Sequence, residues 1–364
     1  MSRAREIADL GSPAASGLSN RNLIINGAMQ VAQRGTSFAN PSDDTYSLDR
    51  MHIFNSNDGA TTITQDTTVP SGEGFTQSIK FDCTTIDGTI AAGQYVAVDH
   101  RIEGLNNAVL GYGASGAKSI VVSFYAKSNL TGTFCYSVRN SAINRSYIKE
   151  FSLSSADTWE RISFTIPGDT SGTWLTTNGI GSIHTISLSL GSTYQGTANQ
   201  WNTSNVSATS NQVNFLSSTD NEFFLTGWQV EIGDTATPFE HEDIGTTLAK
   251  CQRYYVKFEA QGTYTNYAFG SVTNGTTAEV HASLPVTMRD EPVIETSGTL
   301  GNFRTWDSGG GYTVTAINQG NYSNLNVGSI NVGCSGGGMT TGRAVKLQDN
   351  GNHTANYIAF KAEL

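Results

Sequence analysis

Charged residues are scarce in this sequence. Asp, Glu, Lys and Arg make up 14% of the 364 residues, against roughly 25% in an average globular protein. Their place is taken by Ser, Thr, Asn, Gln and Gly, the last of which occurs 39 times. Long helices are built mainly from Ala, Leu, Glu and Lys, so this composition favours short strands joined by tight turns. Aromatic and β-branched residues occur throughout, which excludes a disordered polymer.

Positive charge is the scarcer sign, and the formal net charge is −10. A phosphate backbone would be repelled, so we expect no nucleic-acid partner. The chain also has no apolar run long enough to cross a bilayer, and its first residues lack the apolar stretch of a secretion signal. We therefore expect no membrane insertion, and a protein that is made in a cytoplasm and remains soluble there.

Cysteine and histidine are few and dispersed. The cysteines are Cys83, Cys135, Cys251 and Cys334. They are too far apart for a disulfide framework and show no CxxC spacing for zinc, so we expect them to be small core residues. The six histidines never occur at the spacing of metal ligands. The sequence therefore predicts no metal and no cofactor.

From residue 21 onward, apolar and polar residues alternate with the period of two that is typical of strands. The clearest segments are QSIKFDCT (77–84), GQYVAVDHRI (93–102), KSIVVSFYAKS (118–128), GTFCYSVRNS (132–141), WERISFTIPG (159–168), HTISLSLGS (184–192) and EFFLTGWQVEI (222–232). Ile120, Val122 and Phe124, for example, share one face of their segment. Strands at this spacing, separated by Gly, Asn and Pro, predict an all-β fold built on an antiparallel jelly-roll sandwich.

Changes of pattern divide the chain into regions. The last sandwich strand ends at Gly233-Asp234, and TTLAKCQRYY then returns to helical spacing, with Tyr255 on its apolar side. Asn26-Gly27 and Asn274-Gly275 are predicted hairpin turns. The predicted regions are an N-terminal helical attachment arm over 1–20, a jelly-roll sandwich over 21–245, a connecting helix over 246–257 and a smaller C-terminal β-domain over 258–364.

Patterns that suggest catalysis fail in their context. GYGASG (111–116) matches the dinucleotide-binding spacing, but a strand follows where a helix is required. GCSGG (333–337) has the spacing of a nucleophile elbow, but its serine lies in a glycine run between strands. Acidic pairs such as Asp43-Asp44 and Asp290-Glu291 lie at predicted strand ends or loops, and sequence alone does not show whether two carboxylates face each other across a sugar. We expect no enzyme, with a hydrolase as the alternative.

Six segments carry a resemblance to a known family. They are SRAREIADL (2–10), NRNLIINGAMQVAQRGTS (20–37), FFLTGWQVEIGDTATPFEH (223–241), LAKCQRYY (248–255), PVTMRDEP (285–292) and YIAFKAEL (357–364). With these segments the chain resembles tail-fibre and receptor-binding virion proteins of bacteriophages that contain a carbohydrate-binding-like jelly-roll module. The second and third segments are the most specific part of the match.

The resemblance implies a virion protein, assembled in the host cytoplasm, that forms a homotrimer and binds a host cell-surface glycan. The N-terminal arm would attach it to other virion structural proteins. The family supplies no catalytic residue. Carbohydrate-binding jelly rolls often hold a structural calcium ion, but Thr226 and Gln229 stand where an acidic ligand would be expected, so the sequence does not predict this ion and leaves its presence open.

Candidate glycan-binding residues follow from what a sugar requires: amide and hydroxyl partners, and an aromatic platform for its ring. The loop TYQGTANQWNTSN (193–205) supplies this mixture, so Tyr194 and Trp201 are predicted to bind glycan, with Trp174 as a further candidate. The alternative for each is packing against the sandwich. Trp159 and Trp228, in predicted strands, are expected to be packing residues.

The sequence supports three functional hypotheses. The leading one is a structural fibre protein of a tailed bacteriophage that mediates host adsorption without catalysis. The second is a polysaccharide depolymerase tailspike. The third is a head fibre or decoration protein with no receptor role.

The predicted oligomeric state can be measured directly. The apolar stripe of the expected N-terminal helix and a small C-terminal β-domain would both gain apolar burial around a threefold axis. Light scattering at micromolar concentration should therefore give three times the chain mass of 38.8 kDa. A monomer mass would contradict the prediction.

Overall fold

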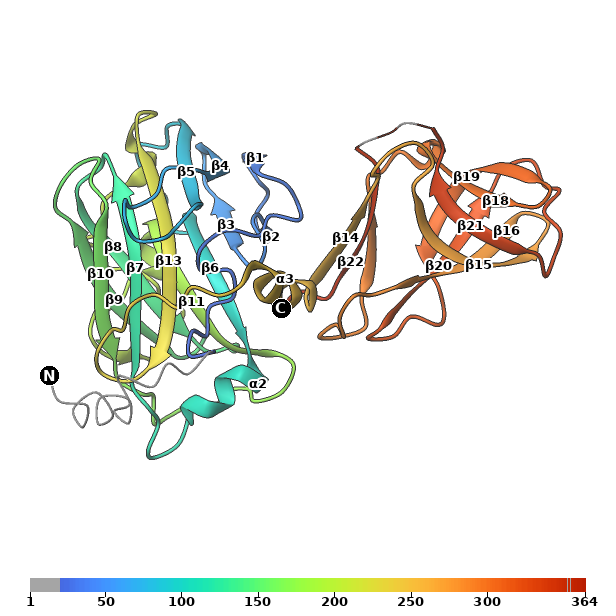
Figure 1. Cartoon of the computed structure of the whole chain (residues 1–364). Helices are drawn as coiled ribbons and strands as arrows, with labels where there is room; N and C mark the ends of the chain where they lie inside the picture. Colours follow the sequence, from blue (N-terminus) through green and yellow to red (C-terminus); the bar gives the residue numbers. More distant parts are fainter. Residues whose placement is uncertain (1–19, 352, 354) are drawn as a thin grey trace, which may run out of the picture. The chain divides into compact units, whose positions relative to one another are not determined.

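The computed structural model describes residues 20–351, 353 and 355–364 (Figure 1). The chain divides into two compact units, with the boundary between Ile244 and Gly245. Except for residue 20, the arm predicted over 1–20 lies outside the described residues. Among the helices of the described residues, none is long and apolar enough to cross a membrane.

The first unit is a sandwich of two antiparallel sheets (Figure 1). One sheet has the order β1 (Ser37–Ala39), β4 (Ala60–Asp66), β5 (Ser78–Thr85), β13 (Glu222–Ile232), β7 (Ile120–Ser128), β10 (Glu160–Ile166). The other has the order β12 (Trp201–Asn202), β9 (Ser146–Leu153), β8 (Gly132–Arg139), β11 (Ile180–Leu190), β6 (Tyr95–Glu103), β3 (His52–Ser56), β2 (Thr45–Tyr46). Short helices are α2 (Gly104–Asn107), η1 (Ala108–Leu110), η2 (Ser192–Tyr194) and η3 (Phe215–Ser217). The predicted all-β jelly-roll fold is confirmed.

The main core of this unit lies between the two sheets and follows the predicted alternation. Ile120, Val122 and Phe124 of β7 are fully buried, and the Phe124 ring stacks on Tyr136 of β8 at a centroid distance of 6.2 Å. Trp228 of β13 is also fully buried, as predicted for a packing residue. Burying side chains of this size contributes roughly 1.5–3 kcal/mol each relative to exposure.

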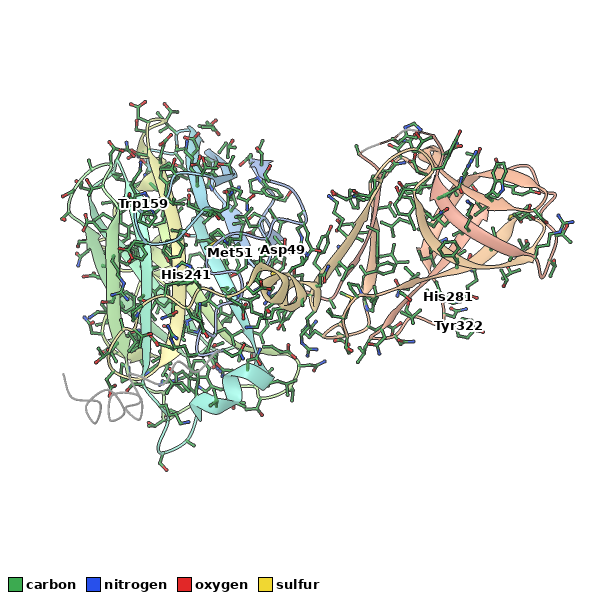
Figure 2. The ribbon with its side chains drawn as sticks, in the orientation of Figure 1. Asp49, Met51, Trp159, His241, His281 and Tyr322 are labelled. Atoms are coloured by element: carbon green, nitrogen blue, oxygen red, sulfur yellow. The ribbon has the colours of Figure 1, made fainter. Side chains whose placement is uncertain are left out.

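Other expected packing residues are also accounted for. Trp159 lies just before β10, half-buried, and its ring packs edge-on against Phe224 at 6.2 Å (Figure 2). All four cysteines are free and buried, as expected for small core residues.

Residues 21–34 do not form the predicted hairpin. The segment contains turns and no strand, and it lies along β13. Leu23 donates its backbone N–H to the carbonyl of Val230 at 2.8 Å, and Trp228 donates to the carbonyl of Gly27 at 3.0 Å. The alternation in this segment therefore reflects its packing on the edge of an existing strand, which a period of two does not distinguish from a strand pair.

One edge of β13 is available to residues 21–34 because β5 pairs with only the first part of that strand. The pairing of β5 with β13 ends at Leu225, and β13 bulges between Thr226 and Gln229. A Cβ atom on Gly27 would lie 2.1 Å from the carbonyl oxygen of Trp228. The close approach of the two backbones therefore requires glycine at position 27.

The second unit contains α3 (Ile244–Gln252), a closed barrel and a small sheet. The barrel has the order β15 (Asn266–Asn274), β16 (Thr277–Ser283), β20 (Val327–Cys334), β19 (Gly310–Gln319), β18 (Phe303–Asp307), β21 (Ala344–Asp349). The sheet has the order β14 (Tyr255–Glu259), β22 (Tyr357–Lys361), β17 (Val293–Thr296), and η4 spans Leu300–Asn302.

Sequence expectations for this unit are confirmed in one place and corrected in another. β15 and β16 pair across Asn274-Gly275, which confirms that hairpin. Tyr255, expected on the connecting helix, instead begins β14 and pairs with Lys361. The helix ends at Gln252 because the buried Tyr255 belongs to the strand pair that closes the small sheet.

Two buried histidines should make the sandwich sensitive to acid. Burial lowers the pKa of His184 to about 3, from an ordinary value of 6.5. Burial also lowers the pKa of His100 well below that value. Tyr136 Oη and Ser182 Oγ lie 2.8 and 3.1 Å from the two ring nitrogens of His184. The unfolded chain would bind these protons near pH 6.5, so the folded state loses stability as the pH falls from there toward about 3.

This acid sensitivity can be assigned to one side chain. Each histidine contributes a slope of up to about 1.4 kcal/mol per pH unit. We expect His184→Gln to flatten the loss of stability below pH 6.5 relative to the unchanged protein, and to lower stability at neutral pH because hydrogen bonds are lost. His281→Gln, at an exposed position (Figure 2), is the control and should keep the original slope. Urea unfolding across this pH range measures the stability of both variants. An unchanged slope of stability against pH in His184→Gln would show that His184 is not a source of the acid sensitivity.

Candidate functional site

The outer face of the seven-stranded sheet carries a pocket. Side chains alternate along each strand, so the neighbours of core residues point away from the sandwich. The strand register places Arg101 of β6, Ile183 of β11 and Arg139 of β8 side by side in one row. Thr185 lies in the next row on the same face. Three central strands thus bring two cations and a hydroxyl to one surface.

A covering segment over residues 190–208 supplies the rest of the wall. Its contact layer with the sheet consists of Ala97, Cys135, Ile148, Leu190, Val206 and Ala208. Tyr194 in this segment packs edge-on against Tyr95 at 5.2 Å, and Tyr95 packs against Phe54 at 5.8 Å. The Tyr95 hydroxyl donates to Asp43 at 2.7 Å. Burial, together with this bond, raises the pKa of Tyr95 to about 12.

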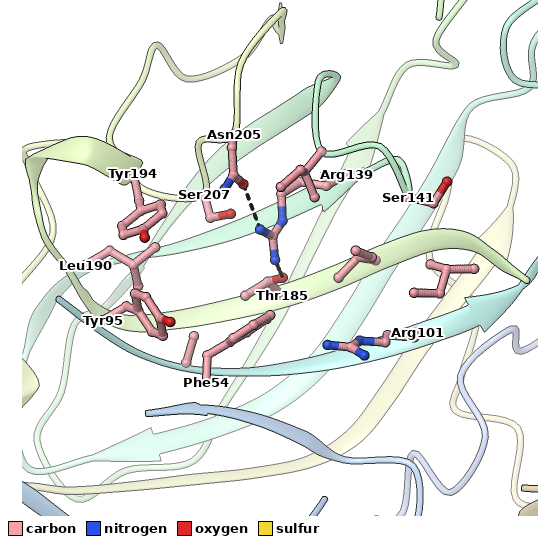
Figure 3. Close-up of a pocket in the computed structure, with 14 residues that line it drawn as sticks. Phe54, Tyr95, Arg101, Arg139, Ser141, Thr185, Leu190, Tyr194, Asn205 and Ser207 are labelled. Carbon is pink, nitrogen blue, oxygen red and sulfur yellow. Dashed lines mark hydrogen bonds between the residues drawn. The ribbon is translucent and has the colours of Figure 1, made fainter. Parts of the chain in front are cut away.

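The pocket between these walls has a volume of about 290 Å³. Small-molecule sites typically have volumes of roughly 300–1,000 Å³. The lining residues are Phe54, Tyr95, Ala97, Arg101, Arg139, Ser141, Ile143, Ile180, Ile183, Thr185, Leu190, Tyr194, Asn205 and Ser207 (Figure 3). A mainly apolar lining with a few convergent polar groups is the usual composition of a ligand site.

Arg139 lies at the centre of the polar groups (Figure 3). Its Nη1 donates to Asn205 Oδ1 at 2.9 Å and its Nη2 to Thr185 Oγ1 at 3.2 Å. Its guanidinium carbon is 5.6 Å from the centroid of the Phe54 ring, a cation–π contact. The residue is 7% exposed. Burial lowers the pKa of Arg139, although the charge of Asp99 opposes this.

Arg101 differs from Arg139 in having counter-charges. Its Nη2 is 3.1 Å from Asp44 Oδ1 and its Nε is 3.8 Å from Asp99 Oδ2. His52 lies between the same two carboxylates, at 2.8 and 2.9 Å. Within the described residues no carboxylate pairs with Arg139 in this way. The two cations of the pocket are therefore electrostatically distinct.

Arg139 Nε and Ser207 Oγ are buried polar atoms of pocket residues that have no hydrogen-bond partner among the described residues. Ser207 is 2% exposed. Buried polar groups are nearly always satisfied, and each exception requires an explanation such as a ligand or an ordered water. The pocket therefore presents unsatisfied hydrogen-bonding capacity next to its aromatic wall.

The rim of the pocket is formed by a strained turn after β8. Ile143 has φ 47°, a value that is rare for a β-branched residue. The buried side chain of Asn140 holds the turn, because its Oδ1 accepts from the backbone N–H groups of Asn144 and Arg145, both at 3.1 Å. Ile143 itself is 42% exposed. Strain of this kind concentrates at binding sites, and here it presents an apolar side chain at the edge of the pocket.

The structure separates the three predicted glycan-binding residues. Tyr194 lines the pocket. Trp201 lies on β12, half-buried, with its ring 5.6 Å from Trp174 and 5.3 Å from Tyr147. Trp174 is buried, at 7% exposed, and packs edge-on against Tyr112 at 4.9 Å. Trp174 therefore presents no exposed ring face to a sugar, and Trp201 packs with Trp174 and Tyr147 and not with Tyr194.

The patterns that suggested catalysis have structural explanations. Residues 111–116 form turns that lead into β7, without a helix N-terminus. Ser335 follows β20 in a bend that no helix follows. Asp43 is held by Tyr95 and Asp44 by His52 and Arg101. Among the described residues there is no group of three or more His, Cys, Asp or Glu side chains that could hold a metal ion.

Sequence reasoning missed Arg139, Tyr95 and Phe54. A signal was present for Arg139: the alternation in GTFCYSVRNS places it on the face opposite Phe134, Tyr136 and Val138, which are all core residues. A charged side chain on a central strand is unusual in a chain with so few charges. What the sequence did not reveal is that residues 190–208 cover this face.

The different settings of Trp201 and Tyr194 predict different consequences of substitution. Trp201→Ala removes a ring from an aromatic cluster and a hydrogen bond from its Nε1 to Pro167 O at 3.1 Å. We expect this variant to lose about 2–4 kcal/mol of unfolding free energy, near the lower range for buried aromatic residues. Tyr194→Ala should lose only about 1 kcal/mol, because a single edge-on ring contact is removed. Urea unfolding tests both; equal losses would show that Trp201 is not a packing residue.

Comparisons with known proteins give distant structural likenesses. No family model matches the sequence, and no curated protein matches it. The enzymatically active domain of tailspike protein 4 from bacteriophage CBA120 matches with 10% identity and a TM-score of 0.30, over 58% of this chain and 22% of that chain. The family 11 carbohydrate-binding module of Clostridium thermocellum matches with 12% identity and a TM-score of 0.27, over 57% of this chain and 98% of that one. A xylan-binding domain of Paenibacillus barcinonensis matches with 8% identity and a TM-score of 0.25, over 55% and 94%. Likenesses at these scores do not assign a ligand to this chain.

Proposed function

We propose that this protein is a non-enzymatic fibre component of a tailed-bacteriophage virion, and that its sandwich binds a host-surface glycan in the pocket of the seven-stranded sheet. It acts as a homotrimer, which attaches to the particle through its N-terminal arm. The observation that carries the proposal is the pocket itself, where an aromatic wall lies next to buried hydrogen-bonding groups without partners.

The chemistry of the pocket fits a sugar. Tyr95, Tyr194 and Phe54 supply ring faces and edges for the apolar side of a pyranose, and the Tyr95 ring is held in place by its bond to Asp43. Ser207 and Thr185 supply hydroxyl groups. A rigid β-sheet positions most of these groups, so little ordering is needed on binding.

The virion assignment rests on the sequence resemblance, and the structure places its two most specific segments in contact. Asn22 Oδ1 accepts from the backbone N–H of Val230 at 3.0 Å, and Asn22 Nδ2 donates to Trp228 O at 3.1 Å. Glu240 accepts from the N–H of Asn22 at 2.9 Å. Residues 20–37 and 223–241 therefore form one structural unit that closes the sandwich.

The proposal is tested by measuring binding to an array of bacterial surface polysaccharides and to host cells. We expect binding by the intact protein and a loss of several-fold in affinity for Tyr194→Ala, since an aromatic contact is worth about 0.5–1.5 kcal/mol. Tyr322→Ala is the control, because Tyr322 is 66% exposed on the second unit (Figure 2). If both variants keep full affinity, the pocket is not the site.

The same experiment distinguishes the other two functions. Release of reducing ends from a bound polysaccharide would identify a depolymerase and overturn the absence of catalysis. A protein that binds no polysaccharide and no host cell, yet is found on the particle, would be a head fibre or decoration protein.

A further inference from the structure

We propose that the pocket of the seven-stranded sheet selects acidic saccharides, and that Arg139 binds the anionic group of the sugar, a carboxylate or a sulfate ester. The inference rests on the proposed glycan-binding function and adds the chemical class of the ligand.

Arg139 is a buried cation without a direct ion pair, and the charge of Asp99 acts on it only through space. A buried cation is unfavourable unless it is paired, and breaking a buried pair is costly because it leaves such a charge behind. Arg139 is 7% exposed, and its two protein acceptors, Asn205 and Thr185, are both neutral. The chain as a whole carries a net charge of −10. A surplus of acidic residues was available to neutralise this arginine, and none of those in the described residues forms an ion pair with it.

Arg139 also has more N–H donors than the protein's acceptors use. A guanidinium group has five N–H donors and accepts nothing. Asn205 and Thr185 take one each, and Nε has no partner among the described residues. The remaining N–H groups can donate two parallel hydrogen bonds to a carboxylate, sulfate or phosphate, an arrangement that is stronger than a neutral hydrogen bond. Ser207 Oγ, also without a partner, can donate a further bond from the covering segment.

The guanidinium of Arg139 is held in a fixed position. Asn205 and Thr185 hold it from two sides, and it lies over the Phe54 ring (Figure 3). Arg101, whose charge is shared with Asp44 and Asp99, lies on the same row of the sheet and adds positive potential. A sugar ring against Tyr194 and Tyr95 would bring its substituents to this group. A neutral sugar would leave Arg139 buried without a direct ion pair, so the pocket discriminates against it.

The test uses matched pairs of ligands that differ only in charge. Oligouronates of several linkages are compared with the same oligosaccharides after chemical reduction of the carboxyl groups, and sulfated dextran oligosaccharides are compared with unmodified dextran. We expect the full-length protein to bind at least one acidic member about 30-fold or more tightly than its neutral counterpart, the loss typical of a buried charge left without its partner. The carboxylate and sulfate arms identify which anion is taken.

Variants of the intact protein assign the effect to Arg139. Arg139→Met removes the charge and keeps most of the volume, so it should abolish the preference for the acidic ligand. It should leave the melting temperature unchanged or raise it, because an unpaired buried charge is removed. Arg139→Lys retains the positive charge but lacks the paired N–H donors of the guanidinium group, so it should keep part of the preference for the acidic ligand. The matched control is Arg161→Gln on β10 of the other sheet, which makes a similar change in net charge outside the pocket and should bind as the unchanged protein does.

The outcomes separate this inference from the proposed function. Equal affinity for charged and neutral members of every pair, with binding still weakened by Tyr194→Ala, would overturn the acidic preference and leave glycan binding intact. An acidic preference that persists in Arg139→Met would also overturn the inference. Absence of binding to any saccharide would overturn both. If Arg139→Met does not fold, the ligand pairs and Arg139→Lys still decide the result with folded protein.

Discussion

The structure depends on the way β13 changes partners along its length. Its first half pairs with β5, and after the bulge at Thr226–Gln229 its free edge is taken by residues 22–27. Backbone groups at the centre of a sandwich must be paired, so the strand could not remain buried without that second partner. Segments about 200 residues apart in sequence are thereby joined, with Asn22 accepting from both Ile24 and Val230 through one side-chain oxygen.

This junction also orients the sheet that carries the candidate site. Trp228 extends from β13 into the core, where its Nε1 donates to Tyr136 Oη of β8 at 3.4 Å. Tyr136 in turn contacts His184 of β11, which is paired with His100 of β6. The opposite faces of these three strands carry Arg139, Thr185 and Arg101. The polar chain in the core therefore fixes the strands whose outer side chains form the pocket, and a site on such a support is well pre-organised.

The candidate site illustrates the limit of reasoning from local pattern. The 193–205 loop was identified by its composition, and one of its two aromatic residues, Tyr194, does line the pocket. Trp201 has the same composition around it, but it packs with Trp174 and Tyr147 because β12 pairs with β9 at that position. An exposed amide-rich loop and an amide-rich segment that packs against the sandwich have similar sequences, because the sequence does not show which other segments cover them.

The class of fold, most of the long strands and their inward faces could be predicted from the amino-acid sequence, because alternation at a period of two is a local property and burial follows it. The sequence also indicated the packing role of Trp228 and the hairpin at Asn274-Gly275. Two features could not be predicted in this way: residues 21–34 complete β13 instead of pairing with themselves, and residues 190–208 enclose Arg139. Both features depend on contacts between segments that are distant in the chain. The energy of such contacts depends on which backbone and side-chain groups still lack hydrogen-bond partners once the sheets have formed, and a local sequence pattern does not show this.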